Sequence, residues 1–372
     1  MNIGIVLYPT FGGSGVVATE LGKALARRGH QVHFITYKQP VKLDRFEPNV
    51  HFHEVRVSDY PLFEYQPYEF VLSSKMVDVA KFEKLDLLHV HYAIPHASSA
   101  YMAKQILKSE GINLPVITTL HGTDITLVGK DSSFEPVITF AINQSDAVTA
   151  VSESLKRDTY EHFRINKDIE VIPNFICLGD YGTAEQGLKE SFSKKGEKIL
   201  IHVSNFRKVK RVEDVVSIFS QVNKKIPSKL LLVGDGPERH KIEEMCRQNS
   251  TCNDIHFIGK MKNTESLLAI SDVFLLTSEF ESFGLAALES MASSVPVIST
   301  NGGGIPEVIE EGKSGFMFDV GDVNGMAAKT LEILKDDTLH QELKKGAYQR
   351  ARHFDLERVL PLYLDLYNRL TK

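Results

Sequence analysis

Residues 3–36 read IGIVLYPTFGGSGVVATELGKALARRGHQVHFIT. An apolar run leads through a glycine-rich turn into residues with helical spacing, and a second apolar run follows. These features predict a strand at 3–8, a helix at 16–28 and a strand at 31–36. A strand, a helix and a strand in this order form the βαβ unit of parallel sheets, so the expected fold class is α/β.

The same alternation recurs in two series along the chain. The first series has further strands at 50–55, 85–91, 115–120, 147–151 and 170–172. The second has strands at 198–203, 229–233, 255–257, 273–276 and 295–299, and helices at 212–224, 238–247, 265–270 and 284–292. The stretch between the two series is rich in glycine and charged residues and has no regular hydrophobic period, which predicts a linker. We therefore expect two doubly wound Rossmann-like domains facing each other across a cleft. The expected bounds of the first domain are 1–173, joined by a C-terminal helix at 356–372. Those of the second are 198–355, and the linker is expected at 174–197.

Composition narrows the class of protein. The 372 residues suffice for two or three domains, and the net charge of −5 argues against a nucleic-acid-binding surface. Three cysteines without C-x-x-C spacing make a disulfide framework and a structural zinc site unexpected. We find no 18-residue apolar run and no basic segment before the first strand, so a cytoplasmic protein without integral membrane contact is expected.

The turn Gly12-Gly13-Ser14-Gly15 follows the first strand and opens a helix. Glycines there let backbone amides approach a phosphate at a helix N-terminus, so Gly13, Ser14 and Gly15 are candidate donor-binding residues. The alternative is a tight turn that needs small residues. A dinucleotide site would also need an acidic residue after the second strand, where Tyr37-Lys38 stands, so a nicotinamide cofactor is disfavoured.

Two polar residues follow strands of the first series, at the carboxyl edge where α/β proteins bind ligands. His121 follows strand 115–120 and is suited to donate a hydrogen bond to a sugar, although His121-Gly-Thr-Asp124 also fits a capping turn. Tyr92 follows strand 85–91 and places a hydroxyl at that edge. His89, His91 and His96 lack a further ligand at a typical spacing, so no metal is expected there.

A cationic run, Arg207-Lys208-Val209-Lys210-Arg211, lies between strand 198–203 and the next helix. Cations stabilise a departing phosphate and oppose the dipole at a helix start, which favours a pyrophosphate clamp over a solvated charge run. The turns at 234–238 and 302–307 fit phosphate loops and structural turns equally well.

Glu281 and Glu289 flank a Ser-Phe-Gly turn and an apolar helix. At ~1.5 Å per residue, a helix would set them roughly 12 Å apart. The two carboxylates of retaining glycosidases are about 5–5.5 Å apart, so these glutamates are not such a pair. The spacing suits the two ends of a ligand with two hydroxyl-bearing rings around an anionic group.

In order along the chain, these motifs resemble the GT-B glycosyltransferases of family 4. They are Gly12–Gly15, His121–Asp124, Val203–Lys210, Gly234–Glu238, Glu281-x7-Glu289 and Gly303–Glu307. The resemblance covers essentially the whole chain and implies a retaining, UDP-sugar-dependent hexosyltransferase. One position departs from the family, because Asn205 stands where an arginine is common; Arg207 is expected to supply that charge.

The resemblance also implies roles for individual residues. Glu281 would contact the donor sugar, Glu289 the ribose, Lys210 and Arg207 the diphosphate, and His121 the sugar from the other domain. Backbone near Gly259 and Lys260 would hold the base. The other candidates for donor binding are Ser204, Ser282, Phe283, Gly284 and Leu285. Retention is expected without a stable covalent intermediate, with the departing phosphate oxygen accepting the acceptor's proton.

The segments 8–15, 120–126 and 202–211 narrow the resemblance to family members of bacillithiol biosynthesis. This implies UDP-N-acetylglucosamine as donor and L-malate as acceptor, with no cofactor and, since no Asp-x-Asp motif ends a strand, no metal. Candidate acceptor-binding residues, chosen by position, are Ser14, Tyr92, Thr123, Asn174 and Arg207. A GT-B epimerase, another small acceptor, a non-catalytic sensor and a homo-oligomer remain open.

Overall fold

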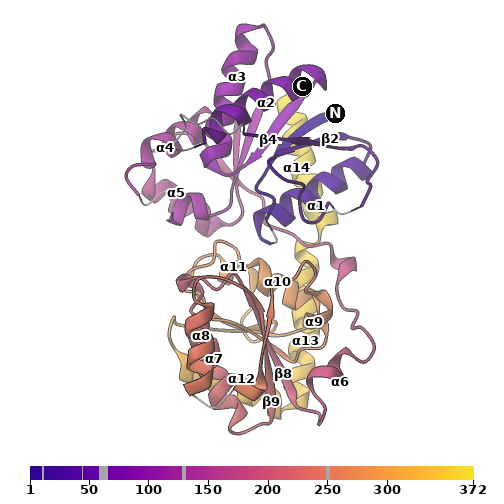
Figure 1. Cartoon of the computed structure of the whole chain (residues 1–372), viewed down its shortest axis with the longest axis vertical. Coiled ribbons are helices and arrows are strands. Elements are labelled where there is room, and N and C mark those ends of the chain that lie inside the picture. Colours follow the sequence, from indigo (N-terminus) through magenta and orange to yellow (C-terminus); the bar gives the residue numbers. More distant parts are fainter. Residues whose placement is uncertain (11, 44, 58–65, 128–130, 249–251) are drawn as a thin grey trace. The chain divides into compact units, whose positions relative to one another are not determined.

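The computed structural model describes residues 1–10, 12–43, 45–57, 66–127, 131–248 and 252–372. Phe11, in the first glycine-rich turn, lies outside these residues. The chain forms two compact units (Figure 1): Met1–Asn174 with Leu356–Lys372, and Phe175–Asp355. Residues 175–197, expected as a linker, belong to the second unit and include helix α6 (Leu188–Phe192).

The first unit is built on a seven-stranded sheet in the order β3-β2-β1-β4-β5-β6-β7, with every neighbouring pair parallel. Its strands are β1 (Asn2–Val6), β2 (Gln31–Thr36), β3 (Val50–Glu54), β4 (Leu87–His91), β5 (Val116–Leu120), β6 (Ala147–Ala150) and β7 (Ile169–Val171). Its helices are α1 (Ser14–Arg27), α2 (Tyr68–Phe82), η1 (Ala93–Ala97), α3 (Ser98–Ser109), η2 (Thr123–Leu127), α4 (Glu135–Gln144), α5 (Glu153–His162) and α14 (Leu356–Thr371).

Helices cover both faces of this sheet, so the side chains of its central strands β4 and β5 are buried along their whole length. On one face, Leu72 and Met76 of α2 and Ala103 of α3 pack against Ile35 and Val90 of the sheet. Figure 1 shows α1 and α14 side by side on the other face. Helix α14 is anchored by Tyr367, whose buried hydroxyl lies 2.7 Å from His89 Nδ1 on β4.

The second unit repeats this plan with six parallel strands in the order β10-β9-β8-β11-β12-β13. They are β8 (Lys198–Ser204), β9 (Ser228–Gly234), β10 (Ile255–Gly259), β11 (Val273–Leu276), β12 (Val297–Thr300) and β13 (Gly315–Phe318). Besides α6, the helices are η3 (Leu178–Asp180), η4 (Lys208–Lys210), α7 (Val212–Asn223), α8 (Arg239–Gln248), η5 (Cys252–Asp254), α9 (Glu265–Ala269), α10 (Leu285–Ala292), α11 (Ile305–Val308), α12 (Val323–Lys335), α13 (Asp337–Ala351) and η6 (Arg352–Phe354).

Both sheets reverse their strand order at one point, between β1 and β4 and between β8 and β11. Ligands of doubly wound sheets bind outside the carboxyl ends of the strands at this switch point. The prediction of two Rossmann-like domains is confirmed, and the switch points show where in each unit to look for a site.

The interval between Glu281 and Glu289 is not helical throughout, so the distance based on helical rise does not hold for it. Helix α10 begins only at Leu285, after Gly284, whose φ of 97° is left-handed. Glu281 lies outside the helix and forms a β-bridge with Gly303. The rise per residue of a helix therefore applies only to the last four steps of the interval.

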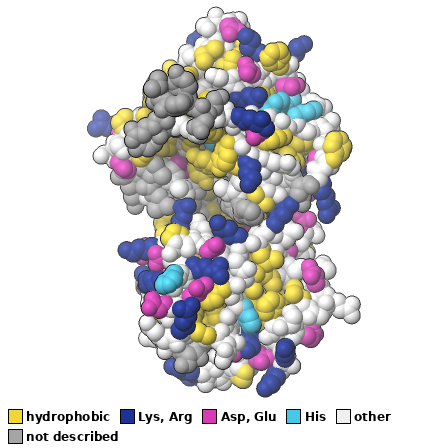
Figure 2. All heavy atoms as spheres, viewed as in Figure 1, with side chains coloured by type: hydrophobic (Ala, Val, Ile, Leu, Met, Phe, Trp, Pro, Cys, Tyr) yellow, Lys and Arg dark blue, Asp and Glu magenta, His cyan; other side chains and the backbone are white. Residues whose placement is uncertain are grey.

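None of the described helices is both long and apolar enough to cross a membrane. Among the described residues on the face shown in Figure 2, basic and acidic side chains are interspersed.

Candidate functional site

The first unit gathers three of the expected site residues at the carboxyl ends of β1, β4 and β5. The hydroxyls of Ser14, the first residue of α1, and Tyr92, which follows β4, are 2.6 Å apart. The Tyr92 ring lies 5.2 Å from the imidazole of His121, which follows β5, and 5.3 Å from the ring of Tyr8. Because β1, β4 and β5 are neighbours in the sheet, residues about 30 and 80 positions apart converge here.

The backbone of this cluster is specialised. Tyr92 has a φ of 88°, a left-handed conformation that costs a non-glycine residue about 1–3 kcal/mol. At Gly15 a Cβ would lie 2.4 Å from the Tyr8 carbonyl oxygen, so α1 can approach β1 only with glycine there. The tight-turn explanation of the glycines therefore has structural support, and their contact with a phosphate stays a prediction.

The surroundings of His121 favour an uncharged imidazole. Burial lowers its pKa to about 3, with the neighbouring histidines His89 and His96 adding to the effect. An imidazole with this pKa is neutral throughout the physiological range, so it acts through hydrogen bonds and not as a cation. A neutral imidazole is compatible with the expected donation of a hydrogen bond to a sugar oxygen, which stays a prediction.

His91 determines which His121 nitrogen can donate. His91 Nδ1 and His121 Nε2 are 2.8 Å apart, and in a pair of neutral rings only one of these atoms carries the proton. If His91 donates, His121 carries its proton on Nδ1 and has a free N–H to offer a ligand. His91 Nε2 is buried without a hydrogen-bond partner among the described residues. No described contact therefore requires the His91 proton on Nε2, which leaves it available on Nδ1 for donation to His121.

Other polar residues near this edge serve the fold. Asp124 is buried and accepts hydrogen bonds from the backbone N–H groups of Ala93 at 2.8 Å and Gly122 at 3.1 Å. Its desolvation raises its pKa to about 6. His89 Nε2 lies 2.7 Å from Thr119 Oγ1, in addition to its contact with Tyr367, so both ring nitrogens are engaged. The expectation of no metal at the His89 motif stays untested.

Two candidate acceptor residues of the first unit are less closely tied to this cluster. The Thr123 side chain is exposed at the start of η2. Asn174 is 6% exposed, and its Oδ1 has no hydrogen-bond partner among the described residues. A buried amide oxygen of this kind is costly unless a ligand or water donates to it.

In the second unit, Lys210 and Glu281 form an ion pair at the carboxyl edge. Lys210 Nζ donates to Glu281 Oε1 at 2.6 Å, and the Ser278 hydroxyl donates to the same oxygen at 2.6 Å. Both charged side chains are largely buried, with 20% and 14% of their surfaces exposed. Lys210 follows β8 and Glu281 follows β11, the two strands of the switch point. Sequence reasoning placed both residues in the donor site but did not foresee this contact.

The side chains of the cationic run 207–211 differ in their surroundings: some form ion pairs within the fold and others are exposed to solvent. Arg211 donates to Asp214 at 2.7 Å and to Glu279 at 3.4 Å, so it stabilises the start of α7. Arg207 and Lys208 are exposed. The solvated-run alternative thus fits part of the motif, while Lys210 turns inward.

The segment before α10 is held by close packing of two loops. The Glu281 carbonyl accepts from the Gly304 N–H at 2.8 Å, and a Cβ at Gly303 would lie 2.2 Å from that carbonyl oxygen. The glycine run is therefore needed to position Ser282 and Phe283, which favours the structural interpretation of this turn. Phe283 is buried and packs edge-to-face on Phe354 at 5.5 Å, and Gly284 and Leu285 start the helix.

The remaining candidates of the second unit lie around the same edge. Ser204 ends β8, and its Oγ is 2.7 Å from His202 Nε2, while Gly259 ends β10 and precedes the exposed Lys260. Glu289 lies on α10 close enough to Tyr181 to help raise the pKa of that phenol, which burial already raises well above its usual value. Tyr181 lies in the expected linker, where nothing in the local pattern indicates its closeness to Glu289.

Comparison with known proteins identifies the class of enzyme. The description "Glycosyltransferase Family 4" matches residues 11–179, and "Glycosyl transferases group 1" matches residues 185–350. The N-acetyl-alpha-D-glucosaminyl L-malate synthase of Bacillus anthracis is 49% identical over 370 residues, covering 99% of this chain and 96% of the relative. An uncharacterized glycosyltransferase of Methanocaldococcus jannaschii is 25% identical, over 98% and 97% of the two chains.

Solved structures agree on the fold. The sucrose-phosphate synthase of Thermosynechococcus elongatus has a TM-score of 0.82 at 21% identity, over 100% and 99% of the chains. The Anabaena protein HepE, in complex with UDP and glucose, has a TM-score of 0.83 at 19% identity, over 99% of both. With the two Rossmann-like sheets and the motifs at their carboxyl edges, these matches show that the chain belongs to the GT-B glycosyltransferases of family 4.

Proposed function

We propose that this glycosyltransferase moves N-acetylglucosamine from UDP-N-acetylglucosamine to the hydroxyl of L-malate with retention of configuration, the first step of bacillithiol biosynthesis. The observation that carries the proposal is the 49% identity over 99% of the chain to the N-acetyl-alpha-D-glucosaminyl L-malate synthase of Bacillus anthracis. The geometry supports it in each unit, with a charged pair beside a helix start in the second and a hydroxyl pair beside a neutral imidazole in the first.

In this proposal, the second unit binds the donor. Its diphosphate lies at the N-terminus of α10, where the N–H groups of the first turn and the helix dipole favour negative charge. Lys210 shifts from Glu281 to the phosphates, and Glu281 is then free to accept hydrogen bonds from the sugar hydroxyls. Glu289, one helical turn along α10, binds the ribose.

The transfer step follows from these contacts. The malate hydroxyl attacks the anomeric carbon from the face that the diphosphate leaves. The bond from that carbon to the phosphate oxygen breaks, and the leaving oxygen takes the proton of the hydroxyl. Lys210, Arg207 and the α10 amides stabilise the charge on the diphosphate. The Ser14 and Tyr92 hydroxyls, with Thr123 and Asn174, supply hydrogen-bond donors for malate's carboxylates.

The direct test measures UDP release from UDP-N-acetylglucosamine with L-malate as acceptor. D-malate, succinate, which has no hydroxyl, and inositol phosphate serve as alternative acceptors. L-malate should give the highest kcat/KM and succinate no turnover, and NMR should show an α-linked product. A higher kcat/KM for inositol phosphate would favour the alternative of a different small acceptor.

Incubation with UDP-N-acetylglucosamine alone separates a transferase from an epimerase. A GT-B epimerase converts the nucleotide sugar without an acceptor, whereas the proposed enzyme leaves it largely intact. Epimer formation at the rate of malate-dependent UDP release would overturn the proposal.

Tyr92→Phe tests the acceptor site. The change removes the hydroxyl that lies 2.6 Å from Ser14 Oγ and keeps the ring against His121. Loss of one hydrogen bond to a charged ligand should raise the KM for L-malate by about tenfold or more and leave the KM for the donor unchanged. Tyr101→Phe, on α3, is the matched control. An unchanged malate KM in Tyr92→Phe would remove Tyr92 from the acceptor site.

Transfer should not depend on a divalent cation. The chemistry assigned here leaves charge stabilisation to Lys210, Arg207 and helix amides, so EDTA should leave the initial rate unchanged. The measurement is the rate of UDP release with EDTA and with EDTA plus excess Mg²⁺. Activity that disappears with EDTA and returns with Mg²⁺ would contradict this expectation.

A further inference from the structure

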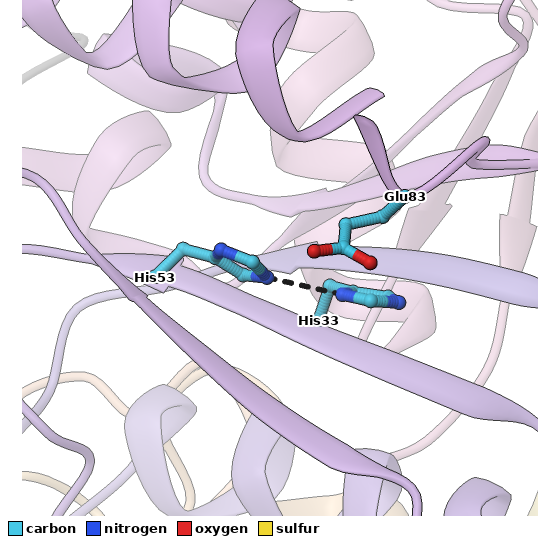
Figure 3. A group of neighbouring side chains, drawn as sticks. All are labelled: His33, His53 and Glu83. Atoms are coloured by element: carbon cyan, nitrogen blue, oxygen red, sulfur yellow. Dashed lines mark hydrogen bonds between the residues drawn. The ribbon is translucent and has the colours of Figure 1, made fainter. Parts of the chain in front are cut away.

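Two imidazoles and a carboxylate meet at the edge of the first unit's sheet. They come from β2, β3 and the end of α2, whereas the proposed transfer groups follow other strands. His33 lies on β2, His53 on the edge strand β3, and Glu83 directly follows α2. Figure 3 shows the three side chains pointing toward one another. One ligating atom from each lies within 4.8 Å of the other two, and His33 Nδ1 is 3.0 Å from His53 Nε2.

The fold brings these groups together for local reasons. In the parallel register of β2 and β3, Ile35 pairs with His53, and residues two apart on a strand share a face. Helix α2 covers that face, because Ile35 packs with Leu72 and Met76. Glu83 is the C-cap of α2, its N–H bonded to the Val79 carbonyl at 2.9 Å and its carbonyl to Asn2 Nδ2 at 2.9 Å. The backbone of Glu83 is thus held in place beneath its carboxylate.

The distances suit a transition-metal ion. Tetrahedral zinc binds imidazole nitrogen at ~2.0–2.1 Å, which places two ligand atoms roughly 3.3 Å apart. His33 Nδ1 and His53 Nε2 need to separate by only a few tenths of an ångström, within the freedom of a side-chain torsion. Two imidazole nitrogens and one carboxylate oxygen form a common zinc ligand set, which leaves a fourth position for water.

The charge states of the three side chains favour binding of a cation. His33 is 2% exposed, and burial lowers its pKa to about 4, with His51 adding to the effect and Glu83 opposing it. Burial also lowers the pKa of His53, opposed by Glu83 and assisted by Lys75. Neutral imidazoles offer their lone pairs to a metal without competition from protons. Glu83 carries its negative charge at a helix C-terminus, where the dipole disfavours it and a bound cation would offset it.

His51 lies beside the cluster but outside the ligand set. Its ring stacks on His33 at 4.7 Å, while its Nε2 is 3.0 Å from Gln31 Oε1. A substitution of His51 is therefore a control for one of His53, because both residues lie on β3.

We propose that His33, His53 and Glu83 bind one divalent transition-metal ion of the zinc class, at a site separate from the groups that carry out transfer. The three ligands come from β2, β3 and the end of α2, so the ion joins the edge strand to the helix that covers it. An ion that binds only this folded arrangement stabilises the fold by mass action.

The experiment titrates EDTA-treated, dialysed full-length protein with ZnCl2 alone, by calorimetry, after alkylation of the accessible cysteines under native conditions. Wild type should bind one Zn²⁺ per chain, and a Co²⁺ titration should give the intense visible bands of a four-coordinate ion. Glu83→Gln and His53→Gln each remove a ligand at a partly exposed position and should weaken Zn²⁺ binding by about tenfold or more. His51→Gln should bind as wild type.

Folding of each variant is checked by circular dichroism and by Tm in EDTA. Zinc should raise the Tm of wild type and His51→Gln and leave that of the two ligand variants nearly unchanged. Absence of one-to-one binding in wild type overturns the proposal. So does wild-type affinity in either Glu83→Gln or His53→Gln. Malate-dependent UDP release is measured separately, so failure of the metal site and failure of the proposed function are distinguishable.

Discussion

Glu281→Ala should lower kcat by about 10²-fold or more, the scale seen when one preorganised polar contact to a transition state is removed. In the proposal, this carboxylate binds the donor sugar, so its loss leaves the sugar poorly oriented for attack. Its absence also leaves Lys210 without its 2.6 Å partner. A cation freed in this way should bind phosphate at least as well, so the Kd for UDP should stay constant or fall.

Kinetics of UDP release and a UDP titration by calorimetry measure the two effects of Glu281→Ala. Glu279→Ala is the matched control, because Glu279 is an exposed glutamate two residues away that pairs with Arg211. Glu281→Gln keeps the shape and one acceptor oxygen, so it should retain more activity than alanine. A wild-type kcat in Glu281→Ala would remove the central assignment of the donor site.

Lys210→Ala should reduce both kcat and the affinity for UDP. Lys210 turns inward from η4, the short helix after β8, and its amine is paired with Glu281. Its removal takes away charge stabilisation of the leaving diphosphate, so kcat should fall by about 10²-fold. It also leaves the Glu281 carboxylate, 14% exposed, as an unneutralised negative charge near the phosphates. We therefore expect the Kd for UDP to rise by about tenfold or more.

The two substitutions thus have opposite effects on UDP affinity, which separates a phosphate contact from a sugar contact. Lys208→Ala is the control for the lysine, since Lys208 lies in the same short helix with an exposed side chain. Lys210→Arg should not restore full activity, because a planar guanidinium does not replace the compact ammonium. Unchanged UDP affinity in Lys210→Ala would refute the clamp.

Local patterns predicted the secondary structure of the central strands well. Strand 31–36 and strand 273–276 have the expected bounds, because each run of strand-forming residues ends where the chain meets a turn. The start of α10 was misplaced by one residue, since Gly284 takes a left-handed φ and acts as the cap. Glu281 precedes even the predicted start at 284, so a distance based on helical rise does not apply to the whole interval from Glu281 to Glu289.

The candidate site was predictable as a set of positions but not as a set of contacts. Residues that follow parallel strands lie at one edge of a sheet, so the motifs after β4, β5, β8 and β11 were expected there. The pairing of Lys210 with Glu281 joins residues 71 positions apart, and no local pattern carries that information. The same holds for the meeting of Ser14 and Tyr92, and of His33 with His53 and Glu83.

By itself, the sequence determined the α/β class, the two Rossmann-like series and the glycosyltransferase family, because apolar periodicity and short motifs are local properties. Only the tertiary structure decided that His121 is neutral, that Lys210 is held by Glu281 and that Arg211 serves the fold. Desolvation and ion pairing depend on all the atoms that surround a group, and those atoms come from strands far apart in the chain.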